Sequence, residues 1–168
     1  MDNPSASTDA MLQIPEGICV LTHDVLCVND IIQSVGDDRA GATAVFIGTT
    51  RNHFQVVTRL DYQAYSKLAI KTMADIIRIA HANHSRFSHR PEQSSIVTPF
   101  IRTAVYHRLG TVPVGEPSIV IAVSSPHRKE AFAACEFILE EVKQRVQIWK
   151  REFYEGERKE DAEWKANE

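Results

Sequence analysis

Apolar residues recur along the chain in two patterns, one typical of strands and the other of helices. Short apolar runs between glycines, prolines and polar turns predict strands, at residues 17–27 (a strand or hairpin), 41–48, 56–65, 101–107 and 117–124. Apolar positions spaced by three and four residues predict helices, at residues 29–36, 66–84 and 125–151. Strands and helices mix without regular βαβ alternation, so we expect an α+β fold with a mixed or antiparallel sheet and two main helices.

The second main helix is expected to run from Ser125 to Arg151 without interruption. Ser125 suits the N-cap and Pro126 suits the first helical position. The apolar residues that follow recur at helical spacing and are Phe132, Cys135, Leu139, Val142, Val146 and Trp149. We therefore expect these side chains, Trp149 included, to be buried against the rest of the domain.

Lys143 and Lys150 lie seven residues apart on this predicted helix. Seven residues are about two turns, so both ammonium groups would share one face, about 10 Å apart. A lysine at the edge of a buried stripe can lose part of its solvation, which makes its neutral, nucleophilic form available. The alternative is that both side chains lie along apolar surface with their charges in water and have no chemical role. Spacing alone favours this alternative.

Further cations precede or follow predicted elements. His127 and Arg128 fall in the first turn of the long helix, where free amides and the positive end of the dipole attract anions. An arginine is unfavourable there, which points to an external anion, although a solvated surface arginine is the alternative. Thr49, Thr50 and Arg51 follow the strand at 41–48, and loops at strand ends often hold ligand groups.

Composition and charge remove several classes of function. The chain has 168 residues, which is one domain with a sizeable core. Its net charge of −3 gives no support for a nucleic-acid binder, and no run approaches the roughly 18 apolar residues of a membrane span. Cys19, Cys27 and Cys135 are odd in number and form no C-x-x-C pair, so neither a disulfide framework nor a zinc knuckle is indicated. We expect a reducing compartment, the cytosol.

A metal site is the remaining alternative for the histidines. His81, His84 and His89 lie in and after the helix at 66–84. No carboxylate or cysteine completes an obvious ligand set, and a structural zinc site needs four clearly spaced ligands. We therefore expect no metal.

Several spaced motifs resemble the molybdopterin synthase large (catalytic) subunit family. In chain order they are Gly41-Ala42, Phe46-Ile47-Gly48, Arg51-Asn52-His53, His107-Arg108-Leu109-Gly110, Val114-Gly115-Glu116, Ser125-Pro126-His127-Arg128, Ala131-Phe132, and Lys143 through Trp149-Lys150-Arg151-Glu152. The resemblance covers residues 15–155. Residues 1–14 are then expected to be a flexible tail and residues 156–168 a charged one.

The resemblance implies an α+β fold with a β-hammerhead element and a homodimeric core. Each large subunit would bind a small ubiquitin-like sulfur carrier that ends in a Gly-Gly thiocarboxylate, giving a heterotetramer. The enzyme would transfer two sulfurs to cyclic pyranopterin monophosphate and so form the dithiolene of molybdopterin. It implies no cofactor.

The resemblance also implies residue roles. Lys143 and Lys150 match the family's catalytic lysines. The implied substrate-pocket residues are Thr49, Thr50, Arg51, His127, Arg128, Lys143, Lys150, Arg151 and Glu152. The chain departs from the family at Thr49, where a basic residue is frequent, at Gln147, where proline is usual, and at Glu140, where aspartate is frequent. The segment at 86–98 is longer than usual.

Two alternatives stay open. One is a non-catalytic scaffold that docks a ubiquitin-like sulfur carrier. The other is a lysine Schiff-base enzyme with a pyridoxal cofactor, which would absorb near 400 nm.

The spacing of Arg128 and Lys143 bears on the quaternary structure. They lie fifteen residues apart, about 22 Å along one straight helix, which is too far for one pterin phosphate to contact both. The segment between them contains no proline or glycine, so a break is unfavourable. We therefore expect an active site shared across a homodimer, with each subunit contributing one end of the helix.

Overall fold

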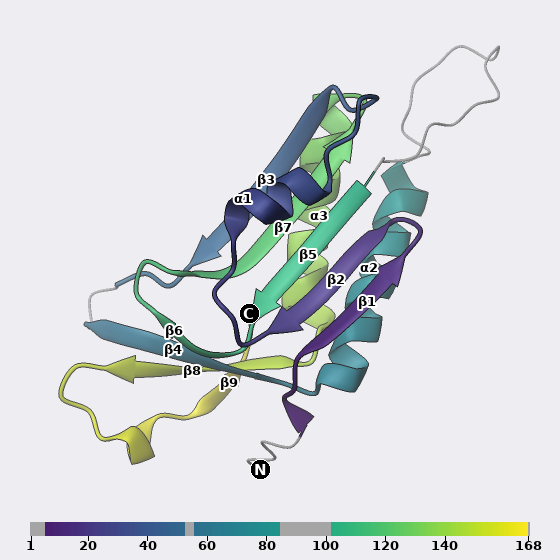
Figure 1. Cartoon of the computed structure of the whole chain (residues 1–168). Coiled ribbons are helices and arrows are strands. Elements are labelled where there is room, and N and C mark those ends of the chain that lie inside the picture. Colours follow the sequence, from purple (N-terminus) through teal and green to yellow (C-terminus); the bar gives the residue numbers. More distant parts are fainter. Residues whose placement is uncertain (1–5, 53–55, 85–101, 168) are drawn as a thin grey trace, which may run out of the picture.

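The computed structural model describes residues 6–52, 56–84 and 102–167, which form two sheets and three α-helices (Figure 1). The larger sheet has the strand order β1-β2-β5-β7-β3. Its strands are β1 (Ala10–Ile14), β2 (Gly17–Thr22), β5 (Arg102–Arg108), β7 (Pro117–Ser125) and β3 (Ala42–Thr49). Strands β2 and β5 run parallel, and the other neighbours run antiparallel. This mixed sheet confirms the predicted α+β class.

The smaller sheet is antiparallel throughout, with the order β6-β4-β8-β9. Its strands are β6 (Gly110–Pro113), β4 (Val57–Ala64), β8 (Ile148–Tyr154) and β9 (Trp164–Ala166). A short 3-10 helix (Lys159–Asp161) connects β8 to β9. The smaller sheet lies at one end of the larger sheet (Figure 1).

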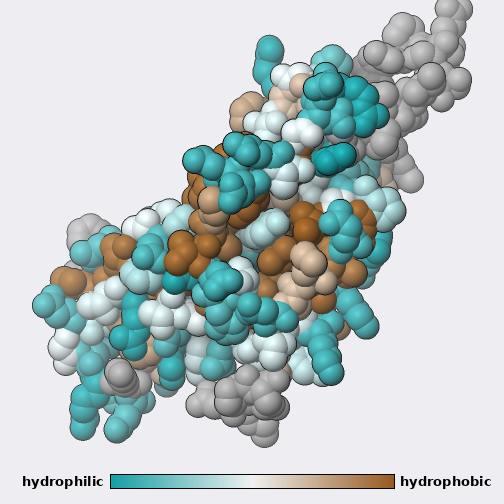
Figure 2. All heavy atoms as spheres, in the orientation of Figure 1, coloured by the Kyte–Doolittle hydropathy of each residue, from teal (hydrophilic) through white to brown (hydrophobic). Residues whose placement is uncertain are grey.

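Two long helices and one short helix cover the larger sheet. Helices α2 (Ser66–His84) and α3 (Arg128–Arg145) pack on one face, and α1 (Val28–Ser34) lies on the other (Figure 1). The main core lies between the sheet and the long helices, and its fully buried side chains include Met73, Ile77, Val105, Ile121 and Ile138. A smaller cluster lies under α1. Apolar side chains remain visible over the strands beside α1 (Figure 2).

Most elements lie where the hydrophobic pattern predicts them. Helix α2 has the predicted bounds, and β3, β4, β5 and β7 are shifted by one or two residues at most. The predicted N-terminal tail is too long, because residues 10–14 form β1 and pair with β2. The predicted C-terminal tail contains β9, which pairs with β8. None of the helices in the described part of the chain has both the length and the apolar character of a membrane span.

The prediction of one helix from Ser125 to Arg151 is wrong at both ends. Ser125 is the last residue of β7, where it pairs with Ala42, and the helix begins at Arg128 with His127 as its N-cap. The helix ends at Arg145, and Val146 already has an extended backbone. Residues 148–154 then form β8 and pair with β4, so Lys150 lies on a strand and not on the helix face that carries Lys143.

The predicted apolar stripe is therefore only partly buried. Cys135, Val142 and Val146 belong to the main core. Phe132, however, is 66% exposed on the outer side of α3, and Trp149 is 40% exposed on β8. The buried aromatic residue of β8 is Phe153, which is 7% exposed and lies under the Arg59 guanidinium at 4.0 Å.

These positions set the stability that each aromatic residue contributes. We expect Phe153→Ala to lower the free energy of unfolding by about 3–5 kcal/mol, as is usual for a buried phenylalanine. Trp149→Ala on the same strand should cost clearly less, because much of its surface stays in water in the folded state. Urea unfolding of both variants measures the difference. Equal losses would show that Trp149 is covered in solution.

Candidate functional site

A cavity of about 900 Å³ lies where the two sheets meet. Its walls come from the end of β3, the strands β4 and β8, the start of β7 and the last turn of α3. Strand pairing is irregular in this wall, with register shifts at Gly48–Thr49 of β3 and between Val57 and Arg59 of β4. Bulges of this kind occur preferentially beside functional sites, where they redirect side chains.

Gly48 allows the close approach of β3 to β7 in this wall. A Cβ atom at this position would lie 2.7 Å from Cγ2 of Ile119. Any larger residue would therefore force the Ile119 side chain, or the strand that carries it, to shift. Packing in this wall thus favours glycine near the end of β3.

Strand β8 presents one of its two faces to the cavity. Lys150, Glu152 and Tyr154 line the cavity, as expected for residues two apart on a strand. Trp149, Arg151 and Phe153 take the other face of β8. The two faces of this strand therefore separate a cavity side from a packing side, and each face carries both charged and aromatic residues.

Two further cations reach the same cavity. Lys143 extends from the last turn of α3, and Arg51 from the loop after β3. Together with Lys150 they face one carboxylate, that of Glu152, among the described residues that line the cavity. The excess of positive charge favours an anionic ligand, and an arginine can bind a phosphate through two parallel hydrogen bonds.

Glu152 connects two of its neighbours on β8. Its Oε1 lies 3.8 Å from Nζ of Lys150, and its Oε2 accepts a hydrogen bond from the hydroxyl of Tyr154. That hydrogen bond to a carboxylate raises the pKa of Tyr154 to about 12. The Tyr154 hydroxyl therefore stays protonated, and remains a donor to Glu152, over the whole physiological range.

His107 forms a neutral part of the cavity wall. It is 1% exposed, and its Nδ1 lies 2.8 Å from the carbonyl oxygen of Arg108. Because a carbonyl can only accept, Nδ1 carries the proton and Nε2 accepts from the Asn167 amide at 3.1 Å. Its ring meets Tyr62 edge-on, with 4.9 Å between centroids. Burial lowers the pKa of His107 to about 4, so it is neutral at physiological pH.

This burial makes stability depend on pH. The folded chain keeps His107 neutral down to about pH 4, whereas the unfolded chain takes up the proton near pH 6.5. Stability is therefore lost as pH falls between these values, by about 3 kcal/mol. The His107→Gln variant has no such proton. Between pH 7.5 and pH 4, its free energy of unfolding should fall by about 3 kcal/mol less than that of the unaltered chain. Denaturant unfolding at both pH values measures it. Identical losses in the two proteins would contradict the assignment.

The structure brings together five of the nine predicted site residues. Thr49, Arg51, Lys143, Lys150 and Glu152 all line the cavity. Sequence reasoning did not select His107, Tyr62, Tyr154 or Asn167 for the site, although they also line the cavity. Tyr154 could have been found if the segment had been assigned as a strand, because residues at steps of two from Lys150 share its face.

Four predicted residues lie elsewhere. Thr50 is buried, and its backbone bonds to Glu116 and Gly115. Arg151 points to the other face of β8, with NH2 3.5 Å from Oδ2 of Asp61 and its guanidinium over the Trp164 ring at 4.5 Å. There it lines a smaller cavity of about 160 Å³.

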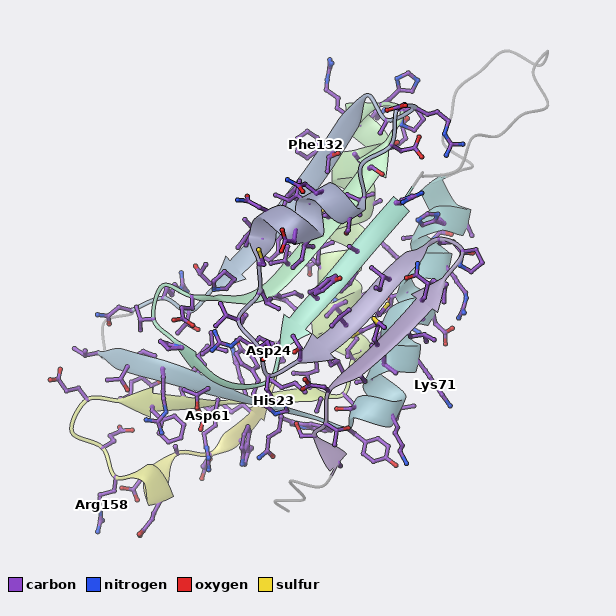
Figure 3. The ribbon with its side chains drawn as sticks, in the orientation of Figure 1. His23, Asp24, Asp61, Lys71, Phe132 and Arg158 are labelled. Atoms are coloured by element: carbon purple, nitrogen blue, oxygen red, sulfur yellow. The ribbon has the colours of Figure 1, made fainter. Side chains whose placement is uncertain are left out.

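His127 and Arg128 lie at the opposite end of α3 from Lys143. Phe132, one turn after Arg128, marks that end of the helix, whereas Asp61 marks the smaller sheet (Figure 3). Neither His127 nor Arg128 lines the cavity of their own chain.

One of the three histidines weighed as metal ligands has another role. His81 is buried, and its Nε2 lies 2.9 Å from Oγ1 of Thr103. No group of three potential ligands gathers anywhere in the described residues. His89 lies outside them, as does the segment at 86–98.

Comparison with known proteins decides the family. The family described as MoaE protein matches residues 21–145, which is more than half of the chain. The chain belongs to the MoaE protein family. A relative from Drosophila melanogaster, the molybdopterin synthase catalytic subunit, is 41% identical over 149 residues, which are 88% of this chain. The match spans only 36% of that relative's own length.

Solved structures from other organisms have the same fold. Molybdopterin synthase from Staphylococcus aureus matches with a TM-score of 0.69 and 27% identity, over 86% of this chain and 94% of that one. A complex of subunits 1 and 2 of the molybdopterin-converting factor from Helicobacter pylori matches with a TM-score of 0.61. At 19% identity, over 83% of this chain and 87% of that one, the second match concerns the fold alone.

Proposed function

We propose that this chain is the catalytic subunit of a molybdopterin synthase. Sulfur would pass from the C-terminal thiocarboxylate of a small subunit to cyclic pyranopterin monophosphate, and two transfers would give the dithiolene of molybdopterin. The observation that carries this proposal is the cavity, in which Lys143, Lys150 and Arg51 lie together although they come from a helix, a strand and a loop. The reaction itself is inferred from membership of the MoaE protein family.

The cavity suits each part of the proposed chemistry. The proposed substrate is an anion, and Arg51 would bind its cyclic phosphate. Release of sulfur from an acyl donor moves protons and develops charge at a carbonyl oxygen, which a lysine can serve as acid, base or electrostatic stabiliser. A Gly-Gly tail has no side chains to exclude, so it could enter the cavity where the two sheets meet.

We further propose that each site is completed by a second copy of the chain. Helix α3 is continuous from Arg128 to Arg145, so Arg128 and Lys143 lie about 22 Å apart in one subunit. A two-fold dimer can place His127 and Arg128 of one subunit at the cavity of the other, giving two equivalent sites. With one ubiquitin-like small subunit bound at each site, the assembly would be a heterotetramer. We place it in the cytosol, consistent with Cys19, Cys27 and Cys135, which are free thiols.

The test supplies the purified chain with cyclic pyranopterin monophosphate and a small subunit that carries the thiocarboxylate. We expect conversion to molybdopterin. The matched control is the same small subunit with an ordinary carboxylate, which should bind without turnover. Tight binding of the thiocarboxylated subunit with no conversion would instead favour a scaffold that docks a sulfur carrier.

A further inference from the structure

Three side chains of β8 form a continuous row along the cavity. Lys150, Glu152 and Tyr154 are two residues apart on one strand face and all line the cavity. Successive members of such a row are about 7 Å apart at the backbone. Glu152 therefore stands between a cation on one side and a hydroxyl on the other.

The two oxygens of Glu152 are divided between these neighbours. Oε2 accepts the hydrogen bond of Tyr154, whereas Oε1 lies 3.8 Å from Nζ of Lys150. Hydrogen bonds between N–H and oxygen are about 2.7–3.2 Å long. The contact with Lys150 is thus an ion pair without a direct hydrogen bond, while the contact with Tyr154 is a close one.

We propose that Tyr154 is a positioning residue that holds Glu152 back from Lys150. This inference rests on the proposed function, in which Lys150 exchanges a proton or stabilises charge during sulfur transfer. A carboxylate in close contact would stabilise the ammonium form of a lysine and oppose proton release. By engaging one oxygen from the far side, the Tyr154 hydroxyl keeps the Lys150–Glu152 ion pair long.

Glu152 is the acidic group to consider among the described neighbours of Lys150. Tyr62 on β4 and Lys165 on β9 pair with Lys150 across the sheet. Among the described residues that line the cavity, the remaining titratable or charged groups are Arg51, His107 and Lys143. His107 is neutral, and burial also raises the pKa of Tyr62. Arg51, Lys143 and Lys165 are cations, so Glu152 is the one carboxylate among the described residues that line the cavity.

Tyr154→Phe removes the hydroxyl and keeps the ring. Glu152 then loses its hydrogen bond and can turn toward Lys150, which favours the charged form of the lysine. We expect the titration midpoint of Lys150, followed by NMR of the isolated full chain and assigned with Lys150→Arg, to rise by about one pH unit. Such a rise corresponds to roughly a tenfold lower neutral fraction at pH 7, and turnover there should fall by about the same factor.

A double-mutant cycle separates positioning from a merely structural role. In a Glu152→Gln background, adding Tyr154→Phe should leave the midpoint of Lys150 where it was. The matched control is Tyr65→Phe, which removes a hydroxyl from an exposed residue outside the cavity and should change neither the midpoint nor turnover.

The NMR measurement needs no substrate, so it decides this inference separately from the proposed function. An unchanged midpoint in Tyr154→Phe, or an equal rise in the Glu152→Gln background, would overturn the positioning role. Failure of the unaltered chain to convert cyclic pyranopterin monophosphate would overturn the proposed function and leave the titration result standing.

Discussion

Replacing Lys143 by alanine should abolish product formation and leave the fold intact. The side chain is exposed in the last turn of α3, whereas the adjacent Val142 is buried in the core. Loss of a group that transfers protons or stabilises charge lowers rates by about 10²–10⁴-fold. Turnover with the thiocarboxylated small subunit and thermal unfolding, measured on the same preparation, test both parts of the expectation.

Two further variants sharpen this result. Lys143→Arg should not restore activity, because a guanidinium keeps its proton at any working pH. Lys150→Ala should also be severe. The matched control is Gln144→Ala, the exposed neighbour of Lys143 on α3, which should behave like the unaltered chain. Near-normal turnover in Lys143→Ala at an unchanged melting temperature would remove Lys143 from the chemistry.

The parts of the fold that sequence predicts are those set by local pattern. Helix α2 carries its apolar residues at a consistent helical spacing and begins at Ser66, and its predicted bounds are correct. Strands β3 and β7 are apolar runs bounded by glycine or proline. Strand β7 lies inside the larger sheet and is buried along nearly its whole length, whereas β3 forms the edge and alternates between half-buried and exposed residues. In each case the local signal and the tertiary environment agree.

The boundary between α3 and β8 was missed because two patterns overlap there. Val142, Val146 and Trp149 continue the helical spacing, and neither glycine nor proline marks a break. Residues 148–154 nevertheless begin with the β-branched Ile148 and contain three aromatic side chains, which favours a strand once a partner is present. That partner is β4, more than eighty residues earlier, so a long-range contact decides the assignment.

The same long-range pairing explains what could be predicted of the site. Lys143 and Lys150 were expected to share one helix face, and they do meet at one cavity, but from α3 and β8. Motif resemblance therefore selected two lysines that share a cavity, although the predicted helical geometry was wrong. The role of His107 depends on burial and on Asn167, sixty residues away in sequence, and no local pattern contains that information.

Two inactive variants should restore activity to each other if the active site is shared between subunits. Arg128→Ala damages the start of α3 and Lys143→Ala damages its end. Unfolding the two together and refolding them pairs subunits at random, so about half of the dimers are mixed. Each mixed dimer has one intact site and one site with both changes, and roughly a quarter of the normal activity should return.

The control pairs Lys143→Ala with Lys150→Ala. Both lysines line the cavity of a single chain, so every site in a mixed dimer still lacks one of them and no activity should return. Activity from the first mixture and none from the second would place Arg128 and Lys143 on different subunits of one site. If mixed dimers form in the first mixture and stay inactive, Arg128 and Lys143 do not complement across the dimer. The 22 Å of α3 that separates them would then have to be bridged within one chain, which a continuous helix does not allow, and Arg128 would lose its place in the site.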